Sequence, residues 1–139
     1  MHILDYAAVA IICLAGIYFL GLGVSAFILP ARTASFLGSF AGSAFAHYLE
    51  MSLRLVVGFA LLRFAPQMPI SIAFTVFGWL LVGTTACLLL IPWQWHHKFA
   101  QRTVPRVLHY LKLVAAVSIA LGIAFLTAAV HALIYPNAS

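Results

Sequence analysis

The sequence predicts an all-α integral membrane protein, a four-helix transmembrane bundle whose single domain covers residues 1–139. Composition is the first observation behind this prediction, because 65% of the residues are hydrophobic and 6% are charged, whereas about a quarter of the residues in soluble domains are charged. The second observation is that the apolar residues form four runs, each long enough for the roughly 20 residues that cross a bilayer core. The third is that the charged residues cluster next to these runs.

The first run, residues 6–29, is stopped by Pro30 and predicts the first helix. It contains Gly16 and Gly23, which lie on one face and favour the close approach of another helix. A signal peptide is the alternative, since Val24-Ser25-Ala26 resembles a cleavage site. No lysine or arginine precedes the run, however, and the run exceeds the roughly 7 to 15 residues of a signal-peptide core, so we expect this helix to remain.

Residues 31–43 are rich in small and hydroxyl side chains, and we expect them to form a short connector along the membrane surface. Ser43 is a candidate N-cap, because its hydroxyl can accept a hydrogen bond from the first turn of the next helix. The second run, residues 44–65, predicts that helix. The segment Pro66-Gln67-Met68-Pro69 follows it and is long enough only for a tight turn.

The third run, residues 70–91, is stopped by Pro92. The fourth run, residues 105–134, would form a helix of about 45 Å, which is longer than the bilayer core is thick. We therefore expect its first two turns, which hold Arg106, His109 and Lys112, to protrude into the headgroup region. A ladder of small residues along this helix predicts a contact surface within or between subunits, and it comprises Ala116, Ala120, Ala124 and Ala128.

The second run carries an acid and a base, Glu50 and Arg54, at the i, i+4 spacing that favours an ion pair on a helix. His47, Gly58 and Ala65 fall on the same stripe. Charges inside a bilayer cost several kcal/mol unless they pair, reach the surface or face protein. We therefore predict a structural ion pair around which the other helices are arranged. The alternative hypothesis is a protonatable Glu50 at the centre of a small transporter or ligand-binding membrane protein.

Histidines suggest a further alternative. His47 and His109 are expected at the same ends of the second and fourth helices, where they could hold a haem iron or, with His96 and His97, a metal ion. The sequence has no Cys-x-x-Cys-His or His-Glu-x-x-His motif and no paired carboxylates for a di-iron site. It also lacks the glycine context of a nucleophile elbow. We expect no cofactor and no catalysis, and a haem- or metal-binding redox subunit is the alternative hypothesis.

The segment between the third and fourth runs mixes tryptophans with cations. In a soluble protein this mixture, with a formal net charge of +5, would suggest nucleic-acid binding. Between two membrane helices it predicts an aromatic belt and contact with anionic lipid headgroups, and we expect no nucleic-acid partner. The predicted lipid-contact residues are Trp93, Trp95, Lys98, Arg102, Arg106 and Lys112.

The distribution of lysine and arginine predicts the orientation in the membrane. The first and third connectors hold Arg32, Lys98 and Arg102, whereas the opposite side has only Arg63. The positive-inside rule then predicts a multi-pass protein of a bacterial-type inner (plasma) membrane with both termini on the non-cytoplasmic side. Cys13 and Cys87 lie at different depths in their runs, so we expect no disulfide between them.

The pattern Glu50-x3-Arg54-x3-Gly58, followed by Pro66 and by Pro92-Trp93-x-Trp95-His96-x2-Phe99-Ala100, resembles small four-helix proteins of bacterial inner membranes whose activity is unassigned. DoxX-type subunits, which serve quinone-linked oxidoreductases in some bacteria, are similar in size and helix count. The resemblance assigns no functional residue. We expect a non-enzymatic structural or accessory subunit that forms a homo-oligomer or docks in a larger membrane complex.

Overall fold

The computed structural model describes residues 3–39, 43–92, 94, 95, 98, 102 and 109–135. The elements in this part of the chain are all helical: α1 (Ile3–Ile28), α2 (Pro30–Ser39), α3 (Ala44–Phe64), the 3-10 helix η1 (Ala65–Gln67), α4 (Ser71–Leu90) and α6 (Leu111–Ile134). Among these described residues, α1, α3 with η1, α4 and α6 are long and apolar enough to cross a membrane. The predicted fold class, all-α with four transmembrane helices, is confirmed.

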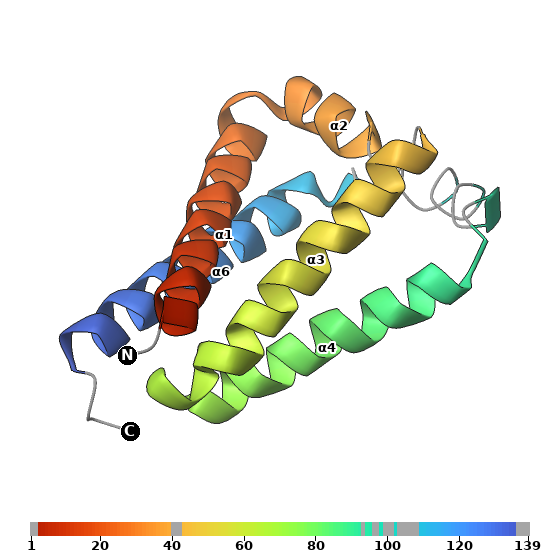
Figure 1. Ribbon diagram of the computed structural model, residues 1–139. Helices are drawn as coiled ribbons and strands as arrows, with labels where there is room; N and C mark the ends of the chain where they lie inside the picture. Colours follow the sequence, from red (N-terminus) through yellow and green to blue (C-terminus); the bar gives the residue numbers. More distant parts are fainter. Residues whose placement is uncertain are drawn as a thin grey trace.

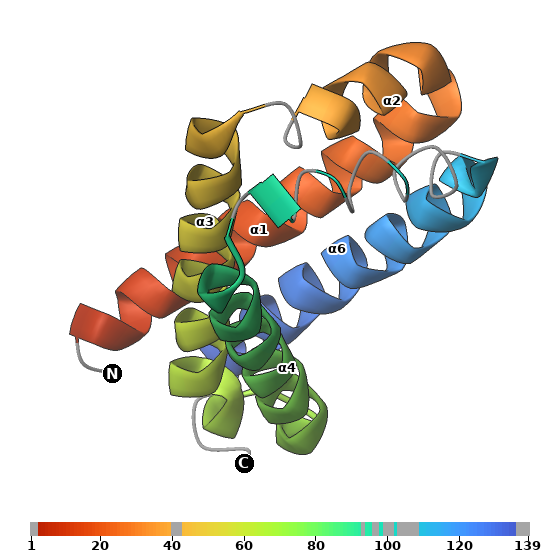
Figure 2. The same cartoon turned by 90° about the vertical axis from the view of Figure 1, so that its right-hand side faces the viewer.

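The four long helices run alternately up and down the molecule, so that α1 begins and α6 ends at the same end (Figure 1). The turn formed by η1 also lies there, and we call this the η1 end. Helix α2 lies across the opposite end, the α2 end (Figure 1). Figure 2 shows α1 and α6 side by side, with α3 and α4 as a second pair that crosses them obliquely.

Close contacts at glycines hold α1 against α6, which is the most extensive helix interface of the described residues. A Cβ added at Gly16 would lie 3.2 Å from the carbonyl oxygen of Gly122, and one added at Gly23 would lie 2.8 Å from that of Ala115. Side chains at these glycines would therefore force the helices apart. The prediction that Gly16 and Gly23 admit another helix is confirmed.

The face of α6 that packs inward is not the predicted alanine ladder. Ala128 is buried and Ala124 partly buried, but Ala116 and Ala120 are exposed, whereas Gly122 faces α1. The buried residues of α6 are Leu111, Ala115, Ser118, Gly122, Phe125, Ala128, Ala129 and Ala132.

Helices α3 and α4 form the second glycine-mediated pair. A Cβ added at Gly58 would lie 3.4 Å from the carbonyl oxygen of Gly78, and one added at Gly78 would lie 3.2 Å from that of Gly58. Helix α1 contacts α2, α3 and α6 extensively, so α1 rather than the charged stripe of α3 is the helix around which the others are arranged. Helix α1 packs against three other helices, whereas Gly58 of the α3 stripe packs against α4.

Aromatic rings close the bundle towards the η1 end. The ring of Phe125 on α6 lies 5.9 Å, centroid to centroid, from that of Phe19 on α1. It lies 6.2 Å from the ring of Phe74 and 5.8 Å from that of Phe77, both on α4. The same core includes Leu61 of α3, so side chains from all four long helices meet there. Towards the α2 end, α4 and α6 diverge (Figure 2).

The connectors follow local sequence signals. The backbone N–H of Ala46 donates a hydrogen bond of 3.2 Å to the Ser43 hydroxyl, which confirms the predicted N-cap. The connector expected after Pro30 is itself largely helical, since α2 begins at that proline, whose fixed φ suits a first helical position. The tight turn after η1 is also present, and Ile70 adopts a left-handed conformation there with φ 58°.

The fourth transmembrane helix begins later than predicted. Tyr110 precedes α6 with φ −100° and ψ 26°, which is not a helical conformation, so α6 starts at Leu111. Residues 105–108 of the predicted helix lie outside the described residues. Lys112 is in the first turn of α6 and is exposed, and His109 precedes that turn.

Candidate functional site

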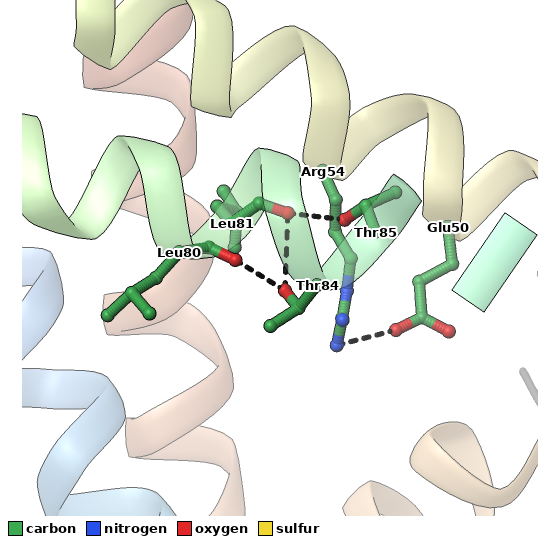
Figure 3. Close-up of polar contacts among 6 residues, drawn as sticks. All are labelled: Glu50, Arg54, Leu80, Leu81, Thr84 and Thr85. Atoms are coloured by element: carbon green, nitrogen blue, oxygen red, sulfur yellow. Dashed lines mark hydrogen bonds and ion pairs between the residues drawn. The ribbon is translucent and has the colours of Figure 1, made fainter. Parts of the chain in front are cut away.

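The chain contains two acidic residues, and the structure pairs each of them with an arginine. The pair on α3 joins Arg54 Nη2 to Glu50 Oε1 at 3.1 Å (Figure 3). The Arg54 side chain is 39% exposed and the Glu50 side chain 31% exposed. Because the two residues stand one helical turn apart, α3 alone sets their distance.

Hydroxyl groups of α4 lie in the same region as this ion pair. Arg54 extends from α3 toward the level of Thr84 and Thr85 on α4 (Figure 3). The Thr84 hydroxyl donates to the carbonyl oxygen of Leu80 at 2.6 Å, and the buried Thr85 hydroxyl donates to that of Leu81 at 2.6 Å. Each hydroxyl hydrogen therefore forms a hydrogen bond within α4, and only the oxygen lone pairs remain to accept from other groups.

The ion pair on α3 is electrically balanced, because it joins one carboxylate to one guanidinium. Both side chains are partly exposed, so both groups can be reached from outside the bundle.

A second ion pair, which the sequence did not reveal, links two helices at the η1 end. Arg63 Nη2 on α3 lies 2.9 Å from Asp5 Oδ1 on α1. The Asp5 side chain is 6% exposed, whereas that of Arg63 is 49% exposed. Asp5 is in the first turn of its helix and Arg63 in the last turn of its own, so each charge also suits the dipole of its helix.

A signal for this pair was nevertheless present in the sequence. Asp5 precedes the first apolar run and Arg63 ends the second, which predicts the same side of the membrane for both. No other aspartate, glutamate, lysine or arginine falls near that side, so each charge had one candidate partner. Asp5 and Arg63 lie far apart in the sequence, and for this reason the sequence alone did not reveal the pair.

The two histidines considered for a haem or metal site differ in burial. His47 is buried in α3, and its ring centroid lies 5.3 Å from that of Tyr48. His109 is exposed before α6, and its ring lies 5.2 Å from that of Tyr110. Within the described residues, no group of three or more His, Cys, Asp or Glu side chains could hold a metal ion. His96 and His97 lie outside those residues.

The residues predicted to contact lipid headgroups are exposed where the structure describes them. They are Trp95, Lys98, Arg102 and Lys112, whereas Trp93 and Arg106 lie outside the described residues. Helix α4 ends and α6 begins at the α2 end (Figure 1). Both cysteines are free, Cys13 partly buried and Cys87 exposed.

Comparison with protein-family models, with curated proteins and with solved structures finds no match to this chain. The functional proposal that follows therefore depends on the arrangement of side chains. That arrangement has two balanced ion pairs, one within α3 and one between α1 and α3. It also has exposed cations at the α2 end.

Proposed function

We propose that the protein is a non-enzymatic structural or accessory subunit of a bacterial-type inner membrane that associates with a second copy through α4. The observation that carries this proposal is the poor coverage of α4. In its most apolar window 11% of the residues are buried, compared with 28% in α1 and in α3 and 33% in α6. A helix that packs so little within its own subunit has a face available for another one.

The exposed face of α4 has the composition of a helix contact. Gly83 and Cys87, four residues apart, are both exposed, and Thr84 and Ala86 beside them are also exposed. A Cβ added at Gly83 would have nothing within 4 Å. Small residues at this spacing let two helix backbones approach closely in a membrane, where packing rather than hydrophobicity drives association. An identical face on a second copy would fit this one.

The native Cys87 provides a test in membranes. Mild oxidation should produce a disulfide-linked dimer that disappears in Cys87→Ala and weakens in Gly83→Leu. Gly21→Leu is the matched control, because a Cβ at Gly21 on α1 likewise has nothing within 4 Å. A cysteine at exposed Val24 in the Cys87→Ala background measures random collision. Equal cross-linking from Val24→Cys and Cys87, or none from Cys87, would exclude association through α4.

A second candidate function rests on the exposure of the ion pair in α3. The Glu50 and Arg54 side chains remain 31% and 39% exposed inside a membrane span. A group so placed could bind a polar ligand or carry a proton in a small transporter. Flux measurements on Glu50→Gln in liposomes separate this function from the structural one, and absorbance near 400 nm separates both from a haem-binding subunit.

The orientation proposed for this subunit places the η1 end outside the cytoplasm. The cations of α2 and of the first turn of α6, Arg32 and Lys112, support it, since they lie at the α2 end while Asp5 and Arg63 neutralise each other at the η1 end. Single cysteines at Lys98 and Ala138, in a background without Cys13 and Cys87, should react with impermeant reagents from opposite faces. Reaction of Ala138→Cys from the cytoplasmic face would reverse the orientation.

A further inference from the structure

Some charged side chains of the protein form ion pairs, whereas others do not. The chain has seven lysines and arginines and two acids, and both acids are used by Arg54 and Arg63. Five other cations remain, and those among them that the structure describes form no ion pair. One of them, Arg32, is an exposed residue of α2. Arg32 can therefore take a counter-ion from outside the chain.

Arg32 stands at the edge of a groove between α1 and α2. The groove has a volume of about 350 Å³, which is at the lower end of the roughly 300–1,000 Å³ of small-molecule sites. Most of its lining surface is apolar. The lining residues are Tyr18, Gly21, Leu22, Ser25, Leu29, Arg32, Thr33 and Phe36.

The length of the groove corresponds to one leaflet of a membrane. Its α1 wall extends from Leu29 to Tyr18, which is about 16 Å at 1.5 Å per residue, and half of a hydrocarbon core is about 15 Å. Leu29 adjoins α2 at the end of the molecule, whereas Tyr18 is near the middle of its span. The groove therefore runs from the headgroup level towards the bilayer centre, with its cation at the headgroup level.

We propose that this groove binds one anionic phospholipid, whose phosphate pairs with Arg32 and one of whose acyl chains lies along Gly21 and Leu22. An arginine guanidinium presents donors in the geometry that a phosphate accepts. At Gly21 an added Cβ would have nothing within 4 Å, so this glycine leaves the groove open without serving a helix contact. The site is separate from the small-residue face of α4.

Gly21→Leu tests the proposal by filling the groove. Its side chain has room, so the variant should keep the helix content and melting temperature of the parent protein. Native mass spectrometry with phosphatidylglycerol should show one tightly retained lipid on the parent protein and about tenfold lower occupancy on Gly21→Leu. Gly83→Leu, the matched glycine variant on α4, should retain that lipid. Unchanged retention by Gly21→Leu would overturn the proposal.

Arg32→Gln tests the choice of an anionic lipid. Both lipids carry a phosphate that can accept from Arg32, but the choline ammonium of phosphatidylcholine repels the guanidinium. The parent protein should therefore prefer phosphatidylglycerol to phosphatidylcholine by about tenfold, and Arg32→Gln should lose this preference. Arg32→Lys, which keeps the positive charge at this position, should keep it. Equal retention of both lipids by the parent protein would overturn the assignment, and so would displacement of the lipid by millimolar inorganic phosphate, which would indicate a small-anion site.

Discussion

The η1 end and the α2 end of the molecule differ in how their charges are paired and in how closely their helices pack. At the η1 end, Asp5 and Arg63 neutralise each other across two helices, and Phe125 brings the helices together. At the α2 end, the ion pair of Glu50 and Arg54 stays within one helix, and α4 and α6 diverge (Figure 2). The comparison shows that one end is held by contacts between helices, whereas the other leaves groups available to lipid or to partners.

Phe125→Ala should have the largest effect on stability, because it removes the ring shared by α1, α4 and α6 at the closed end. Truncation of a buried phenylalanine costs about 3–5 kcal/mol. Ile123→Ala is the control, since Ile123 is on the same helix but exposed. Unfolding in detergent measures both, and similar losses for the two variants would mean that α6 is not held at Phe125.

Arg63→Gln should destabilise the protein more than Asp5→Asn. The first change leaves a buried carboxylate without its cation, and breaking such pairs costs about 3–5 kcal/mol, less here because Arg63 is half-exposed. The second change leaves an exposed guanidinium that can extend to headgroups. Thermal unfolding in detergent should also show partial recovery in the double variant. A larger loss for Asp5→Asn would contradict the burial of that carboxylate.

Glu50→Gln and Arg54→Gln should each cost less than Arg63→Gln. Both side chains are partly exposed, and ion pairs of this kind contribute about 1 kcal/mol or less. The double variant should recover part of the single losses, because the two groups are coupled. If Glu50→Gln is as stable as the parent protein but changes proton or solute flux in liposomes, Glu50 is a transport residue and the structural interpretation is wrong.

Ile70→Gly should have the smallest effect and the opposite sign. Ile70 is exposed and has φ 58°, a conformation that costs a β-branched residue about 1 kcal/mol or more and costs glycine little. The melting temperature should rise slightly. Ile72→Gly, in the first turn of α4, is the control and should lower stability by about 1 kcal/mol. A loss in Ile70→Gly would mean that the side chain stabilises the turn.

The sequence by itself determined the features that depend on neighbouring residues. Proline and small polar residues placed the breaks between the spans, the Ser43 hydroxyl caps α3 as predicted, and the turn after η1 is as short as its prolines require. The spacing of Glu50 and Arg54 likewise brings them within reach of each other wherever α3 packs. These features need no information about other helices.

Only the tertiary structure decided which faces of the helices meet. Apart from the charged stripe of α3, the long helices are apolar on all sides, and lipid is as apolar as a protein interior, so these helices carry no polar stripe to mark the outside. For this reason the sequence did not show that Ala116 and Ala120 of the predicted ladder are exposed, while the stripe through Ala115 and Gly122 packs on α1. For the same reason the sequence did not reveal the partner of Asp5 or the groove lined by Arg32, because each depends on how two helices are placed side by side.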